Sequence, residues 1–293
     1  MVGGSNPSTP APVVLPGYLS ILRPTNAVVS GLVGPLAYLI AGGEPGPVLA
    51  WLFLCVCLVT GAGNTANDVF DAAIDRVNRP DRPIPSGRIS GTGALRYAAI
   101  LSIAGCLAAT PAGALPLLVA VANTALLWLY AARLKQIALA GHLAVAYLSG
   151  SVFLFGGIAA GTDRVVVVLP LVLITFLGTV SRELLKAAED VEGDREGGAR
   201  TFPVRFGIRA TVRLSLLFAL AGIAASLLPY PSWGLPYLVL IAPADLLILG
   251  GALRAARCLT GGCVRDCRAA ALLKAGMFVA LLAFAVSALL AQP

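Results

Sequence analysis

Charged side chains are scarce in this chain. Asp, Glu, Lys and Arg make up only 12% of its residues, about half of the roughly 25% that a soluble domain carries. Hydrophobic residues make up 58%, and the mean hydropathy is +0.88. This composition excludes a soluble domain with a single core and indicates a membrane protein.

Histidine is nearly absent, because His142 is the only one. Cys258, Cys263 and Cys267 lie close together near the end of the chain, but no histidine is near them to complete a zinc site. A disulfide in this loop would be unusual, because a reducing compartment keeps thiols free outside the hyperthermophiles. We therefore expect no zinc at these cysteines, and we expect His142 to serve in packing or capping.

The first sixteen residues lack charge altogether and are rich in Pro, Ser and Gly. They also lack the basic start of a secretory signal. We expect residues 1–16 to form a disordered tail. Residues 17–293 then form a single membrane domain.

Long apolar runs fill this domain. A membrane-spanning helix needs about 20 mostly apolar residues, and in lipid only helices or closed barrels satisfy the backbone. We predict an all-α membrane protein with nine transmembrane helices. The predicted spans are about 17–42, 47–70, 92–110, 113–132, 139–161, 164–188, 209–228, 234–255 and 269–291.

The basic residues predict the orientation of these spans. With the nine spans in place, 20 of the 21 Lys and Arg residues lie on one side, and Arg164 alone lies on the other. The positive-inside rule makes the first side cytoplasmic. We therefore expect a multi-pass protein of the cell membrane. The net charge of +7 is read as this orientation signal, and because acids interleave with the basic residues, nucleic acid is not an expected partner.

An acidic motif ends the second span. Asp68, Asp71 and Asp75 fall within about 40° of one helix face, and Asn67 flanks them. A carboxylate near the centre of a membrane helix costs about 2.5–3.5 kcal/mol on insertion scales, and neighbouring carboxylates repel. One such acid could belong to a helix end that emerges into water. Three on one face favour a functional site.

A second acidic motif, with Asp190 and Asp194, ends the sixth span. Lys186 stands four residues before Asp190, so part of this segment can be read as ordinary salt bridging. That reading leaves the surplus acid at Asp194 unexplained. Mg²⁺ prefers carboxylate oxygens and commonly shares its shell with phosphates. We therefore predict Mg²⁺ as the cofactor, with Asn67, Asp68, Asp71, Asp75, Asp190 and Asp194 as its ligands.

Basic residues follow both motifs and could hold a diphosphate. Five Asp carboxylates, two Mg²⁺ ions and one diphosphate would together leave roughly four negative charges. The available counter-charges are Arg76, Arg79, Arg82, Lys135 and Lys186. Each acidic motif is followed by an Arg, then a Pro and a Gly, which indicates either an internal repeat or two similar turns.

These residues resemble a known family. The run NDVFDAAIDR at residues 67–76, followed by NRPDRPIPSG at 78–87, is similar to the first signature of the UbiA superfamily of intramembrane prenyltransferases. The run DVEGD at 190–194 is similar to the second. The resemblance implies nine helices around a central cavity, cytoplasmic cap loops after helices 2, 4, 6 and 8, and a prenyl tail in an apolar tunnel. It also matches Tyr130 and Lys135 to substrate-binding positions, although a tyrosine at a span end can equally be an interfacial anchor.

The segments RELLK at 182–186, EDVEGDR at 189–195 and TFPV at 201–204 are similar to the archaeal members that make the second ether bond of membrane lipids. This likeness implies transfer of a geranylgeranyl group from its diphosphate to the membrane-borne acceptor geranylgeranylglyceryl phosphate. Arg23, Lys135 and Arg205 are candidates for holding the acceptor phosphate. An aromatic acceptor, as in quinone-precursor prenylation, is the alternative, and a cation transporter is a remote one.

Overall fold

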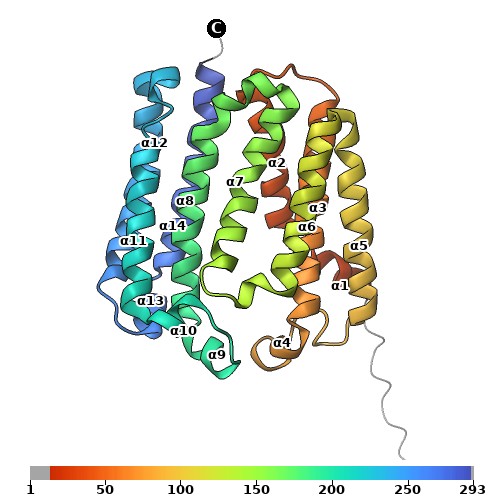
Figure 1. The fold of residues 1–293 in the computed structure, drawn as a ribbon, viewed down its shortest axis with the longest axis vertical. Coiled ribbons are helices and arrows are strands. Elements are labelled where there is room, and N and C mark those ends of the chain that lie inside the picture. Colours follow the sequence, from red (N-terminus) through yellow and green to blue (C-terminus); the bar gives the residue numbers. More distant parts are fainter. Residues whose placement is uncertain (1–13, 292–293) are drawn as a thin grey trace, which may run out of the picture.

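The computed structural model describes residues 14–291, and the regular secondary structure of this part of the chain is helical, apart from one isolated backbone bridge between Ile137 and Arg200. Long helices run side by side, and short helices gather at one end of the bundle (Figure 1). The predicted all-α fold is confirmed. Most of the predicted tail, residues 1–13, lies outside the described residues, and a helix begins at Val14.

Two sets of helices build the bundle. The long ones are α2 (Pro24–Ile40), α3 (Val48–Phe70), α5 (Gly91–Ala108), α6 (Ala114–Ala132), α7 (Ala140–Ala160), α8 (Val165–Glu189), α11 (Ile208–Ala225), α12 (Tyr230–Ala256) and α14 (Ala269–Leu290). The short ones are α1 (Val14–Ile21), α4 (Ala72–Asn78), α9 (Val191–Glu196), α10 (Phe202–Phe206) and α13 (Gly261–Asp266), with single 3₁₀ turns η1 (Thr110–Ala112), η2 (Leu134–Gln136) and η3 (Thr162–Arg164).

Eight helical stretches within residues 14–291 are long and apolar enough to cross a membrane. The first predicted span, 17–42, is not one of them, because its helix is interrupted after α1. Arg23 adopts a left-handed backbone with φ 52°, and Pro24 starts α2, which has 17 residues. Proline lacks an N–H and favours the first position of a helix, so it starts α2 instead of continuing α1.

Small residues set the helix spacing in the core. A Cβ added at Gly156 of α7 would lie 2.5 Å from the carbonyl oxygen of Gly34 in α2. One added at Gly276 of α14 would lie 2.9 Å from the carbonyl oxygen of Ala244 in α12. These pairs therefore pack backbone against backbone, as small residues allow in membrane helices. The close packing fixes the frame that carries the loops.

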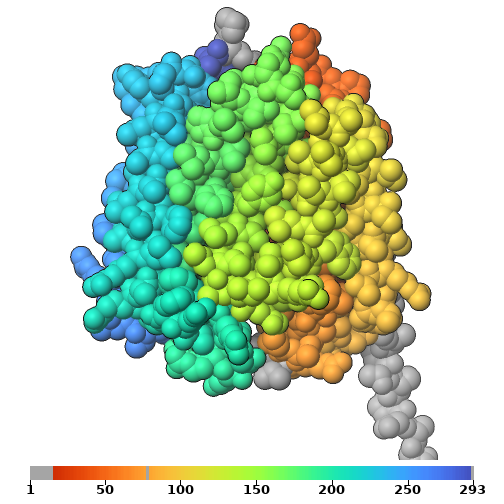
Figure 2. All heavy atoms as spheres, in the orientation of Figure 1, coloured from red at the N-terminus to blue at the C-terminus, as the bar shows by residue number. Residues whose placement is uncertain are grey.

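Both acidic motifs lie at the end of the bundle where the short helices gather. Helix α4 follows α3 directly, and α9 follows α8 directly. Figure 1 places α4 and α9 beside each other at that end, and Figure 2 shows the two segments protruding there, in orange and teal. At the opposite end, Arg164 donates a hydrogen bond to the carbonyl oxygen of Gly42.

The cysteine loop differs from our expectation. Cys258, which follows α12, and Cys263, in α13, form a disulfide, with their Cα atoms 5.5 Å apart. That separation is within the ordinary range for disulfides. Cys267 is free. The expectation of free thiols throughout this loop is wrong, because a tight turn brings two of the three together.

Candidate functional site

The first motif straddles the junction between α3 and α4. Asp71 caps the end of α3 and also begins α4, so Asp68 lies in the last turn of α3 and Asp75 in the first turn of α4. Asp68 and Asp75 are 3% and 5% exposed. The junction therefore gathers carboxylates that a single straight helix would display along its surface.

Two arginines neutralise the buried carboxylates. Arg82 contacts Asp75 at 2.5 Å and Asp68 at 3.2 Å, both through Nη1. Arg23 contacts Asp68 at 2.6 Å. The left-handed turn between α1 and α2 thus positions the Arg23 side chain to contact the first acidic motif. Arg205, which we predicted to hold the acceptor phosphate together with Arg23 and Lys135, lies on α10 with its guanidinium over the ring of Phe206.

A lysine from another part of the chain reaches the third carboxylate. Lys135 in η2 contacts Asp71 with 2.5 Å between Nζ and Oδ1. The turn that carries Lys135 packs tightly on α7, because a Cβ added at Gly141 would lie 2.9 Å from the Cα of Lys135. Each acid of the first motif therefore has a basic partner.

The second motif repeats the local form of the first. Asp190 ends α8 and begins α9, which carries Asp194. The Thr201 hydroxyl donates to Asp194 at 2.9 Å. Burial raises the pKa of Asp194, the Asp190 carboxylate raises it further, and the hydrogen bond from Thr201 opposes both effects. A cation at this position would relieve the cost of keeping Asp194 ionised.

The basic residues of α8 pair differently from the spacing-of-four prediction. Lys186 and Arg182 both contact Glu183, at 3.3 and 2.6 Å. Asp190 has no part in these ion pairs. Glu183 therefore neutralises part of the positive charge of Arg182 and Lys186, and these two basic residues form no ion pair with the acids of α9.

A polar cavity of about 150 Å³ joins the second motif to residues from four other elements. It brings together the predicted site residues of α6, η2, α8 and α9 with two residues that the sequence reasoning did not assign to the site, His142 and Thr201. Thr201 could have been recognised by its place in the second Arg-Pro segment. The cavity is lined by Tyr130, Lys135, Gly141, His142, Glu183, Lys186, Ala187, Asp190, Asp194 and Thr201.

Two predicted binding residues lie apart from these contacts. Arg76 on α4 and Arg79 at its C-terminal cap are exposed.

Asn67 contributes a buried Oδ1 atom that has no hydrogen-bond partner. An unpartnered buried oxygen is costly, and a ligand at the motif would satisfy it.

The donor set suits Mg²⁺. Carboxylate and amide oxygens are the ligands that this ion takes, and the orphaned Asn67 oxygen and the raised pKa of Asp194 both favour a bound cation. Across residues 14–291, however, no three acidic, His or Cys side chains are gathered as a preformed metal site. Lys and Arg occupy the first motif, so an ion would have to exchange with them.

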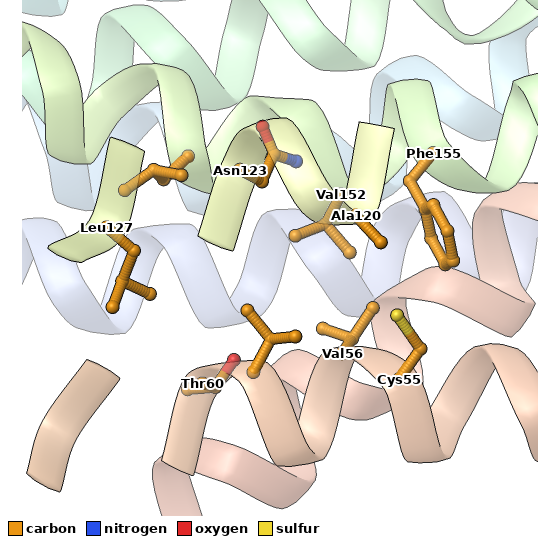
Figure 3. A pocket seen from close by; sticks show the side chains of 10 residues that line it. Cys55, Val56, Thr60, Ala120, Asn123, Leu127, Val152 and Phe155 are labelled. Atoms are coloured by element: carbon orange, nitrogen blue, oxygen red, sulfur yellow. The ribbon is translucent and has the colours of Figure 1, made fainter. Parts of the chain in front are cut away.

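An apolar pocket of about 90 Å³ lies deeper in the bundle. Figure 3 shows it between α3, α6 and α7, with Val56 and Thr60 facing Asn123 and Leu127, and with Phe155 near one end. Thr60 and Asp68 are two turns apart on α3, or about 12 Å at 1.5 Å per residue. The pocket could take part of an apolar chain whose polar head lies at the acidic motifs.

Comparisons with known proteins identify the family of the chain. Residues 27–282 match the model of the UbiA prenyltransferase family. The chain is 51% identical over 274 residues to the digeranylgeranylglyceryl phosphate synthase of Methanoculleus marisnigri, which covers 93% of this chain and 98% of that protein.

Solved structures show the same fold. One, described as giving structural and mechanistic insights into digeranylgeranylglyceryl phosphate synthase in membranes, has a TM-score of 0.78 and 33% identity, covering 94% of this chain and 98% of that one. A UbiA homologue from Archaeoglobus fulgidus bound to GPP and Mg²⁺ has a TM-score of 0.65 and 16% identity, covering 90% of this chain and 99% of that one. Since the family match and the full-length relative both extend over most of the sequence, this multi-pass membrane protein belongs to the UbiA prenyltransferase family.

Proposed function

We propose that this protein transfers a geranylgeranyl group from geranylgeranyl diphosphate to the free glycerol hydroxyl of geranylgeranylglyceryl phosphate, forming the second ether bond of an archaeal lipid. The single observation that carries this proposal is the 51% sequence identity, over 93% of this chain, to a protein with that activity in its name. The proposal is supported by the polar cavity that Asp190 and Asp194 line, together with Lys135, which also contacts Asp71 of the first motif.

The diphosphate of the donor would lie between the two motifs. Asn67, Asp68, Asp71, Asp75, Asp190 and Asp194 would hold Mg²⁺, and the bound ion would neutralise the charge that develops on the departing diphosphate. Arg82, Lys135 and Lys186 would contact phosphate oxygens directly, with the exposed Arg76 and Arg79 nearby. Arg23 and Tyr130 complete the proposed binding residues, and Arg205 remains a candidate for the acceptor phosphate.

Binding of the donor requires an exchange of partners. Arg82 and Lys135 now contact Asp75 and Asp71. With Mg²⁺ held by these carboxylates, the guanidinium of Arg82 and the ammonium of Lys135 would be free to donate to phosphate oxygens. The same residues that pair with the carboxylates in this structure would thus act as donors to a bound diphosphate.

The prenyl chain would extend from the motifs into the bundle. The apolar pocket of Figure 3 is placed to receive part of the chain. Apolar walls would keep water from an allylic cation at C1, which water would otherwise capture. The hydroxyl oxygen of the acceptor then bonds to C1.

We further propose that α2 also spans the membrane, which gives nine membrane-spanning helices. The acidic motifs would face the cytoplasm. Cap segments would cover them, after the second, fourth, sixth and eighth of these nine helices. Glu196, the last residue of α9, and Glu44, in the turn between α2 and α3, are both exposed and lie at opposite ends of the bundle. In intact cells a membrane-impermeant maleimide should label Glu44→Cys and spare Glu196→Cys until the cells are lysed. Labelling in the reverse order contradicts the orientation.

An acceptor panel tests the function. Purified protein receives labelled geranylgeranyl diphosphate with geranylgeranylglyceryl phosphate, 4-hydroxybenzoate or a naphthoate, with Mg²⁺ or with EDTA, and products are identified by mass. We expect the ether product with the glyceryl phosphate alone, and only with Mg²⁺. A prenylated aromatic acid instead identifies the alternative acceptor class. Ion flux across vesicles without diphosphate release identifies a transporter.

A further inference from the structure

His142 lies in the wall of the polar cavity, in the first turn of α7. Only 9% of its surface is exposed, and its Nδ1 atom is buried without a hydrogen-bond partner. We expected this residue to pack or to cap a helix. The structure shows an imidazole with an unpartnered nitrogen in the cavity that the second acidic motif lines.

The other polar groups around the cavity are largely engaged. Lys135 contacts Asp71, Lys186 contacts Glu183, and Thr201 donates to Asp194. Asp190 and Asp194 belong to the proposed metal ligands. The titratable groups that line the cavity with His142 are Tyr130 from α6, Lys135 from η2, Glu183 and Lys186 from α8, Asp190 at the α8–α9 junction and Asp194 from α9.

We propose that His142 is the base that takes the proton from the glycerol hydroxyl of the acceptor. The inference rests on the proposed function, because an aromatic acceptor attacks through carbon and brings no such hydroxyl. The C1–O bond to diphosphate breaks, and its electron pair leaves with the diphosphate. The acceptor oxygen bonds to C1. Its O–H electron pair stays on oxygen, and the proton passes to the imidazole.

Imidazole suits this task better than the neighbouring groups. Its ordinary pKa of about 6.5 leaves it neutral and able to accept a proton at pH 7. Lys135 and Lys186 carry protons already and stand paired with acids. The carboxylates of α9 would be committed to the metal. His142 is thus the group in the cavity with both the free capacity and the right protonation state.

The test follows the partition of the prenyl group between acceptor and water. Wild type, His142→Asn and His142→Gln receive donor, acceptor and Mg²⁺. Ether product, prenyl alcohol and diphosphate are each measured between about pH 4.5 and about pH 8, a range that extends well below the ordinary imidazole pKa. Ser149→Ala on α7 is the matched control, because its hydroxyl contacts only the carbonyl oxygen of Val145. Circular dichroism and gel filtration check the fold of each variant.

We expect both His142 variants to release diphosphate as wild type does while ether formation falls about 10²–10⁴-fold, the usual contribution of a general base. Prenyl alcohol should replace the lost ether. In the wild type, the ether fraction should fall as the pH is lowered, because a protonated imidazole cannot accept a proton. In the variants it should be low at every pH, and in Ser149→Ala it should follow the wild type.

Different results separate this inference from the function beneath it. Wild-type ether yields in a folded His142 variant overturn the base and leave the function standing. A wild-type ether fraction that does not change with pH also overturns the base, whether or not the variants fold. Loss of diphosphate release in a folded variant assigns His142 to donor binding instead. Absence of ether in the wild type, with prenylation of an aromatic acid, overturns both proposals.

Discussion

Lys135 and Asp71 form an ion pair that joins the turn after α6 to the junction of α3 and α4, across 64 residues of sequence. Their side chains are 15% and 30% exposed, so water weakens the pair only in part. We expect Lys135→Gln to lower kcat/KM for the donor about 10- to 100-fold, because it removes a hydrogen bond to a charged group worth about 1.5–3 kcal/mol. Steady-state kinetics with varied donor measures this. Arg133→Gln, an exposed neighbour, is the control, and an equal loss in both variants would contradict a specific role for Lys135.

Arg82 holds two buried carboxylates, and its loss should affect the fold as well as the reaction. Arg82→Gln leaves Asp75 buried and unpaired, which costs about 3–5 kcal/mol when a buried pair is broken. Thermal unfolding in detergent should show a clear drop in midpoint. The double variant Arg82→Gln with Asp75→Asn should recover much of that drop. An exposed control, Arg96→Gln, should change little, and a lack of recovery in the double variant would count against the pairing.

Thr201 tunes Asp194 through a single hydrogen bond. Burial and Asp190 raise the pKa of Asp194, and the hydroxyl of Thr201 lowers it. Thr201→Val removes that lowering, so the carboxylate should take up a proton at a higher pH than in the wild type. The acid side of the pH–activity profile should move upward by about 0.4–1 unit, the equivalent of 0.5–1.5 kcal/mol. More Mg²⁺ should be needed below neutrality. Thr92→Val, at the exposed start of α5, is the control, and a downward shift in Thr201→Val would refute the sign.

Substitution of two glycines by alanine distinguishes the effect of a steric clash from the effect of helix propensity, because only one of the two positions is crowded. A Cβ at Gly141 would lie 2.8 Å from the carbonyl oxygen of Leu134 and 2.9 Å from the Cα of Lys135. Gly141→Ala should therefore displace Lys135 and reduce activity. A Cβ at Gly250 of α12 would meet nothing within 4 Å, so Gly250→Ala should stabilise by about 0.5–1 kcal/mol and keep activity. Comparison of activity and unfolding midpoint in the pair checks both outcomes.

The sequence predicts the helices well because lipid leaves the backbone few choices. Apolar length alone places the eight stretches that are long enough to span. The break at Arg23 and Pro24 was missed, because a hydropathy window averages over one turn of irregular backbone. Asp245 also escaped notice. It is a single acid inside an apolar run, and Ser226 donates to it at 2.7 Å from the neighbouring helix α11.

The acidic residues of the site were predictable, and their partners were not. Helix periodicity places Asp68, Asp71 and Asp75 near one another, since all three belong to one local segment. Arg23 and Lys135 reach them from segments far away in sequence, and only tertiary packing decides which charge meets which acid. His142 gave no local signal for the same reason. Its neighbours in the cavity come from α6, η2, α8 and α9.

The ion pairs of the first motif also bear on how a reaction cycle ends. Diphosphate is a tightly held product wherever several cations surround it, and its departure can limit turnover. Here each of the three cations has a carboxylate waiting within the same junction. If Mg²⁺ and diphosphate bind as proposed, their release would let Arg23, Arg82 and Lys135 return to these carboxylates, so the carboxylates would compete with the product for the same cations. Carboxylates proposed to hold the metal at the start of a cycle would then also help to release diphosphate at its end.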